Sequence, residues 1–121
     1  MRRGDAEYAA ALEAAEEILL DWVTRPFQPL YYSRLSDMLT DRGHAVPAHE
    51  GPMPYLLEDA TRAHGGKDMP MLSAVVVLRE TGRPSGGFFK LARQQPFERP
   101  GDDTALWLAE LAWLEREHRT A

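Results

Sequence analysis

The sequence predicts a small α+β domain in which four helices surround a single β-hairpin, and three observations support this fold class. Residues 70–91 hold two short apolar runs on either side of RETGRPSGG, a stretch of turn-forming residues. Such an arrangement is typical of a hairpin with a long tip. Helical periodicity occurs on both sides of this segment. The length of 121 residues fits one compact domain spanning residues 1–121.

Composition limits the classes of protein to which the chain can belong. An apolar content of 44% with 27% charged residues is ordinary for a globular protein. No run approaches the ~18 apolar residues of a membrane span. The first residues are unlike a signal peptide, because acidic residues and not an apolar run follow Arg2 and Arg3. The absence of cysteine excludes disulfides, thiolate metal sites and a cysteine nucleophile. We therefore expect a cytoplasmic protein with no membrane association.

The charge of the chain is unevenly distributed. The net charge is −5, which argues against general coating of nucleic acid. Residues 1–24 carry two basic and six acidic side chains, and residues 100–121 carry two and five. The middle of the chain, residues 25–99, carries ten basic and eight acidic side chains. This distribution favours a small basic surface on an acidic body.

Four segments carry helical patterns, and residues at their ends support their limits. Ser33 can cap the second helix with its hydroxyl, and Gly43 can close it. Pro54 suits the first turn of the third helix, which Gly65 would end. In the first and last helices, apolar side chains recur every three or four residues. The predicted helices span residues 5–24, 31–42, 53–64 and 103–118.

The order of these elements is that of a winged helix-turn-helix domain with an extra helix at each end. The helix at 53–64 would be the recognition helix, and the hairpin at 70–91 would be the wing. We expect the hairpin tip and the exposed side of the recognition helix to face the same way. DNA is the commonest ligand of such a composite surface.

Two segments resemble the DNA-binding domain of O6-alkylguanine alkyltransferases and the related alkyltransferase-like proteins. Residues 32–36, Tyr-Ser-Arg-Leu-Ser, are similar to the Tyr-Gly/Ser-x-Leu-Ala that opens the helix-turn-helix in that family. Pro70-Met71, then residues 75–77 (Val-Val-Val) and 86–88 (Gly-Gly-Phe), resemble the active-site segment Pro-Cys-His-Arg-Val-Val and the Gly-Gly-Phe that follows it. The resemblance covers roughly residues 30–90 and implies a winged-helix DNA-binding domain.

The chain departs from the family at the positions that carry its chemistry. Met71 stands where the family has its reactive cysteine, and neither His nor Arg follows it. A thioether cannot form a thiolate, so alkyl transfer is excluded. Met53, Pro54 and Tyr55 stand where the family has an arginine that takes the place of an extruded base. The sequence therefore predicts a scaffold without catalysis, a non-enzymatic protein that binds double-stranded DNA in a regulatory or architectural role.

Nine residues are the candidates for contact with nucleic acid. Arginines of the wing can reach a minor groove or pair with phosphate, and tyrosine rings can stack on bases. Glu58 and Asp59 on the recognition helix would oppose a phosphate backbone. The candidates are Tyr32, Ser33 and Arg34 in the second helix, Tyr55, Thr61 and Arg62 in the third, and Arg79, Arg83 and Lys90 in the wing.

A second hypothesis is a protein-interaction module on the same scaffold, which would accommodate the negative net charge. The acidic N-terminal helix or the C-terminal helix with Trp107 and Trp113 would then bind a partner or form a homodimer. His44, His49 and His64 lack the spacing of metal ligands. No serine has a Gly-x-Ser-x-Gly context. We therefore expect no metal, no cofactor and no catalytic residue.

Overall fold

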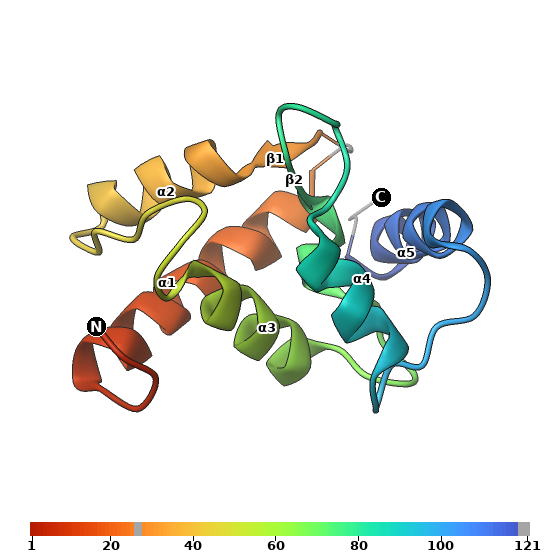
Figure 1. Cartoon of the computed structure of the whole chain (residues 1–121), viewed down its shortest axis with the longest axis horizontal. Coiled ribbons are helices and arrows are strands. Elements are labelled where there is room, and N and C mark those ends of the chain that lie inside the picture. Colours follow the sequence, from red (N-terminus) through yellow and green to blue (C-terminus); the bar gives the residue numbers. More distant parts are fainter. Residues whose placement is uncertain (26–27, 119–121) are drawn as a thin grey trace.

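The computed structural model of the chain describes residues 1–25 and 28–118. The described part is mostly helical, with one small two-stranded sheet (Figure 1). From the N-terminus the elements are α1 (Ala6–Val23), β1 (Leu30–Tyr31), α2 (Tyr32–Asp41), α3 (Met53–His64), the 3₁₀ turn η1 (Leu72–Val75), β2 (Val76–Val77), α4 (Gly86–Arg93) and α5 (Asp103–His118). The helices α1, α2, α3 and α5 overlap the four segments that the sequence predicts as helical.

The predicted β-hairpin is wrong. The two strands are β1 and β2, which are parallel and pair Leu30 with Val76 and Tyr31 with Val77. Residues 71–77 are all buried. Such a continuous apolar run is typical of a segment covered on both faces, not of an exposed ribbon. The segment passes through the core first as η1 and then as β2, which pairs with the two residues of β1.

The expected second strand of the wing is the helix α4. Its buried residues Phe88, Leu91 and Ala92 are separated by three and one positions, which places them on one helical face. Between β2 and α4 the chain makes a tight turn, in which the Gly82 amide donates to the Leu78 carbonyl at 2.8 Å. Gly82 has a φ of +68°, a conformation that favours glycine. The Gly/Pro/Ser cluster is therefore a loop that leads into a helix.

The core forms around α1, which contacts α2, α3, α5 and η1. Ile18 and Leu19 of α1 are fully buried, as is Leu56 of α3. Beside this apolar core, the buried Arg99 pairs with the buried Glu110 of α5. Arg99 also donates to the Met69 carbonyl at 2.8 Å, so the segment between α4 and α5 is fixed to the one that precedes η1.

The length and composition of the helices bear on membrane association. Across the described ranges, 1–25 and 28–118, no helix is both long enough and apolar enough to cross a bilayer.

Candidate functional site

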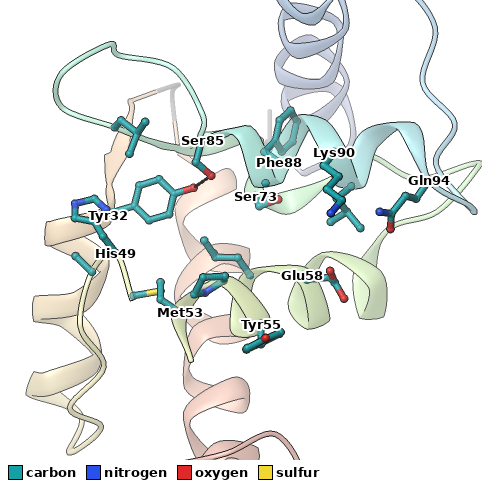
Figure 2. A pocket seen from close by; sticks show the side chains of 16 residues that line it. Tyr32, His49, Met53, Tyr55, Glu58, Ser73, Ser85, Phe88, Lys90 and Gln94 are labelled. Carbon is teal, nitrogen blue, oxygen red and sulfur yellow. Dashed lines mark hydrogen bonds between the residues drawn. The ribbon is translucent and has the colours of Figure 1, made fainter. Parts of the chain in front are cut away.

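A pocket of about 280 Å³ opens between α2, α3 and α4. Figure 2 shows Tyr55 and Glu58 on α3, Lys90 on the facing helix α4, and Gln94 directly after the end of α4. Tyr55 is 51% exposed and Lys90 is exposed, so both belong to the rim. The wall combines apolar side chains with hydroxyl groups, the composition that ligand pockets have in general.

The pocket lies where both strands end. Tyr32 directly follows β1, and Leu78 directly follows β2. Both residues line the pocket. Because parallel strands point in the same direction, the segments that leave them begin at the same edge of the sheet. In larger parallel sheets, ligands commonly bind outside the carboxyl ends of the strands. The parallel topology therefore explains why the pocket lies beyond the carboxyl ends of β1 and β2, although its walls come from distant parts of the sequence.

Tyr32 and Ser85 form the inner wall near α2. Their hydroxyl groups are hydrogen-bonded at 2.9 Å. Burial raises the pKa of Tyr32, and the hydrogen bonds with Ser85 offset this only in part, so the hydroxyl is neutral at physiological pH. The ring of His49 lies 5.5 Å from the Tyr32 ring and is tilted by 45°. Tyr32 is thus a buried wall residue that presents polar atoms to the pocket (Figure 2).

Thr61 does not contact solvent, which corrects its predicted place on the outer side of the recognition helix. It is fully buried, and its hydroxyl donates to the Ser73 hydroxyl at 2.8 Å. Thr61 follows Leu57 by four residues and so lies on the same buried face of α3. A hydroxyl is tolerated there because Ser73 supplies its partner. Thr61 supports the pocket wall from behind and is unavailable for a groove contact.

Two basic residues lie at the start of α2. Arg79 donates from Nε to the Ser33 hydroxyl at 3.2 Å, and its guanidinium lies 4.3 Å from the centre of the Tyr31 ring. Arg34 follows Ser33 and is exposed. In the part of the chain that the structure describes, Arg34, Arg79 and Lys90 have no carboxylate within 4 Å. The charge of these three cations is therefore not neutralised by a described carboxylate, and it can attract an external anion.

The other two predicted basic contacts are engaged within the protein, Arg83 toward α5 and Arg62 beside the pocket residue Gln94. The Arg83 guanidinium lies 5.8 Å from the rings of both Phe89 and Trp107, toward α5. Arg62 donates to the Gln95 carbonyl at 2.9 Å and to the Gln94 side chain at 3.1 Å. The structure therefore places six of the nine candidate residues at the pocket or the start of α2. Arg62 is held at the far end of α3 by Gln94 and the Gln95 carbonyl, Arg83 lies toward α5, and Thr61 is buried.

The α3 side of the rim is acidic, and its carboxylates pair with Arg3, a residue that was not among the candidates from the sequence. Arg3 pairs with Glu58 at 2.9 Å and with Asp59 at 2.6 Å, and its guanidinium lies 4.7 Å from the centre of the Tyr55 ring. Tyr8 donates a short hydrogen bond to Asp59. Burial by itself would raise the pKa of Asp59, but the hydrogen bonds from Arg3 and Tyr8 outweigh it and lower that pKa.

Met71, which the motif resemblance places opposite a reactive cysteine, is not part of the pocket. Its side chain is fully buried, and its backbone amide donates to Glu110 at 2.9 Å. Both serines of the pocket are hydrogen-bonded to other hydroxyl groups, Ser85 to Tyr32 and Ser73 to Thr61. Neither serine is paired with a histidine that would act as a base. Within residues 1–25 and 28–118, no cluster of His, Asp and Glu has a metal-binding arrangement.

Comparison of the chain with protein-family models, with curated proteins and with solved structures gives no match. The resemblance to alkyltransferases therefore stays a prediction from the quoted motifs.

The pocket itself was not predicted from the sequence. A usable signal was present in Ser85-Gly86-Gly87 followed by Phe88, Leu91 and Ala92, because a serine before helically spaced apolar residues is typical of a helix start. With that segment assigned as a helix, a wall opposite α3 would have been expected. No sequence pattern indicates the contact of Arg3 with α3, since 55 residues separate Arg3 from Glu58.

Proposed function

We propose that the protein binds DNA without catalysing a reaction, with one unstacked base in the pocket and the neighbouring cations on the phosphates. The observation that carries the proposal is the combination of the 280 Å³ pocket with Arg34, Arg79 and Lys90, which have no carboxylate partner among the described residues. Proteins that hold a base outside the stack bind it in a close-fitting pocket lined by aromatic and hydrogen-bonding groups.

The chemistry of the wall suits an uncharged planar ligand. Phe88 and the exposed ring of Tyr55 offer apolar faces, and base–aromatic stacking is tolerant of sequence. The hydroxyl groups of Tyr32 and Ser85 and the side-chain amide of Gln94 can donate or accept hydrogen bonds. A base offers both kinds of partner along its edges.

The positions of the cations favour phosphate contacts beside the pocket. Lys90 lies on the rim, while Arg79 is held by Ser33 and by the Tyr31 ring at the start of α2. An arginine held in place loses less conformational entropy when it binds phosphate. We therefore propose that DNA contacts α4 and the start of α2. Insertion of α3 into a groove, as a winged-helix comparison would suggest, is opposed by Glu58 and Asp59.

The protein-interaction hypothesis has less support. It required an exposed stripe containing tryptophan, but Trp107 and Trp113 are only partly exposed. Trp107 donates to the Ala74 carbonyl at 2.8 Å, and the Arg99 guanidinium lies 4.9 Å from the centre of the Trp113 ring. Leu108 of α5 is 54% exposed, but it is a single side chain. Isolated exposed apolar residues are common on proteins that bind no partner there.

The proposal is tested by fluorescence anisotropy with labelled 20-nucleotide duplexes, fully paired or with one unpaired base, and with the single strand. We expect binding at low salt that is tightest for DNA with an accessible base. Replacing Arg79 or Lys90 by alanine should each reduce the slope of log K against log salt by ~0.9. Lys67→Ala is the control, because Lys67 is exposed and lies outside the pocket. No binding by the parent protein at low salt would exclude the proposal.

The pocket is tested separately by filling it. Gly87 lines the pocket, and a Cβ there would approach only the Ser85 hydroxyl, at 3.6 Å. Gly87→Leu should therefore fold, keep binding to paired duplex and lose the preference for an unpaired base. Gly86→Leu is the control, because it adds the same side chain one residue earlier, outside the pocket lining, where a Cβ meets nothing within 4 Å. It should keep the preference for an unpaired base. An unchanged preference in Gly87→Leu would show that the pocket does not hold the base.

A further inference from the structure

We infer that Arg3, from the segment before α1, is a positioning residue of the same site: it compensates the negative charge of α3 and holds the Tyr55 ring, so that a polyanion can approach this side of the pocket. The inference rests on the proposed function, because it explains how an acidic rim tolerates DNA.

The contacts of Arg3 are directed at the rim. Its guanidinium pairs with Glu58 at 2.9 Å and with Asp59 at 2.6 Å, and Nε also donates to Asp59 at 3.0 Å. The same guanidinium lies over the Tyr55 ring. Tyr55 and Glu58 both line the pocket. A single side chain from the start of the chain therefore contacts both pocket-lining residues and the carboxylate next to them.

Among the described cations, Arg62 also acts on these carboxylates, but more weakly than Arg3 does. Arg62 lies 3.8 Å from Glu58, but its hydrogen bonds go to Gln94 and Gln95. Asp59 has no other cation within 4 Å among the described residues. Without Arg3, two carboxylates on adjacent positions of α3 would face the approaching DNA, and each would repel phosphate.

Arg3 also limits the motion of the Tyr55 side chain. The ring is 51% exposed, so packing alone restrains it little. A guanidinium fixed by two carboxylates provides a planar surface against one side of the ring. Loss of Arg3 should therefore affect binding in two ways, by adding uncompensated negative charge and by releasing an aromatic ring of the rim.

The matched control is the neighbouring arginine. Arg2 is exposed, and its side chain has no hydrogen bond or ion pair in the described part of the chain. Arg2→Ala and Arg3→Ala remove the same charge at almost the same place. We expect Arg3→Ala to weaken binding to the unpaired-base duplex about two- to fivefold at low salt, on the scale of one exposed charge interaction, and Arg2→Ala to change it less. Equal losses in the two variants would overturn the inference.

A combined variant separates charge compensation from direct contact with DNA. If Arg3 acts by neutralising α3, Arg3→Ala should weaken binding in the parent but have little effect in a Glu58→Gln, Asp59→Asn background, which lacks the carboxylates that Arg3 compensates. If Arg3 itself holds a phosphate, Arg3→Ala weakens binding equally in both backgrounds, and the inference is wrong. Circular dichroism of each variant checks that it is folded.

A readout without DNA distinguishes failure of the inference from failure of the proposed function. The pKa of the Asp59 carboxyl, measured by NMR titration, should rise in Arg3→Ala and stay unchanged in Arg2→Ala. A parent protein that binds no DNA but shows this pattern would exclude the proposed function and leave Arg3 as a charge compensator alone. An Asp59 pKa that does not respond to Arg3→Ala would overturn the inference whatever the binding data show.

Discussion

The hydroxyl groups of Tyr32 and Ser85 lie 2.9 Å apart and join the first residue of α2 to the residue that precedes α4. The two residues are 53 positions apart in the sequence. This contact joins the two segments that form the inner wall of the pocket, at the point where the loop after β2 leads into α4.

Tyr32→Phe should lower the free energy of unfolding and weaken binding of an unpaired base in the pocket. The substitution keeps the ring but leaves the Ser85 hydroxyl without its partner, which costs about 1 kcal/mol for an ordinary hydrogen bond. Urea denaturation followed by circular dichroism measures the loss. Tyr31→Phe is the control, because the contact of that ring with Arg79 does not use its hydroxyl. Equal stability of Tyr32→Phe and the parent would show that the hydrogen bond contributes nothing.

Gly65→Ala should destabilise the fold strongly. A Cβ at this position would lie 2.7 Å from the Pro70 carbonyl oxygen and 2.9 Å from that of Thr61, both backbone atoms. Forcing such a contact requires the backbone to shift, and we expect a loss on the order of 2–3 kcal/mol. Gly86→Ala is the contrasting variant, since a Cβ there meets nothing within 4 Å. It should keep or raise stability by up to ~1 kcal/mol, and a ranking in the opposite order would contradict the packing around Gly65.

Glu110→Gln should lower the free energy of unfolding by about 3–5 kcal/mol, the cost of breaking a buried ion pair. The carboxylate accepts from the Arg99 guanidinium and from the Met71 amide. An amide offers one acceptor oxygen and turns its NH₂ group toward the other donor. Glu13→Gln, on the exposed side of α1, is the control. A small effect, under about 1 kcal/mol, would mean that solvent reaches the pair.

The stability of the parent protein should fall in acid partly because of Asp59. Its pKa is lower in the folded state than in the unfolded chain, because the hydrogen bonds from Arg3 and Tyr8 outweigh the effect of burial. The charged carboxylate therefore stabilises the fold above the unfolded pKa of about 4. This contribution is lost as the pH falls through the folded-state pKa.

Asp59→Asn isolates this contribution. Thermal unfolding between pH 7 and pH 2.5 should show a smaller acid-induced decrease in Tm for the variant than for the parent. The difference between the two proteins should be greatest at neutral pH and shrink below pH ~4. A difference in Tm between the two proteins that stays constant across the whole pH range would mean that the charge of Asp59 does not contribute to the loss of stability in acid.

The sequence predicted the helices well because each has local signals. Gly43 follows the end of α2, and Pro54 and Gly65 mark the two ends of α3, so breakers within a few residues decide these limits. The predicted cap at Ser33 is wrong, because α2 begins at Tyr32 and the Ser33 hydroxyl accepts from Arg79 instead. The structure places these helices where the periodicity indicated. The sequence also singled out Tyr32, but as a candidate for nucleic-acid contact and not as part of a pocket; the structure buries it in the pocket wall.

The errors came from segments whose structure depends on distant partners. The apolar run at 71–77 satisfies the pattern of a strand, but its partner is β1, more than forty residues earlier, and not the segment after the turn. Once that partner is taken, the residues after Ser85 follow their own helical spacing. Thr61 was misplaced for a similar reason, because only the buried Ser73 hydroxyl makes its burial possible.

Because β1 and β2 run parallel, the pocket exists only when residues near 30 and 76 have met. An unfolded chain has no such cavity, so any occupant binds the native state alone and shifts the melting temperature upward with its concentration. Nucleosides and short oligonucleotides can therefore be screened by thermal denaturation, and the size of each shift ranks them without any assay of activity.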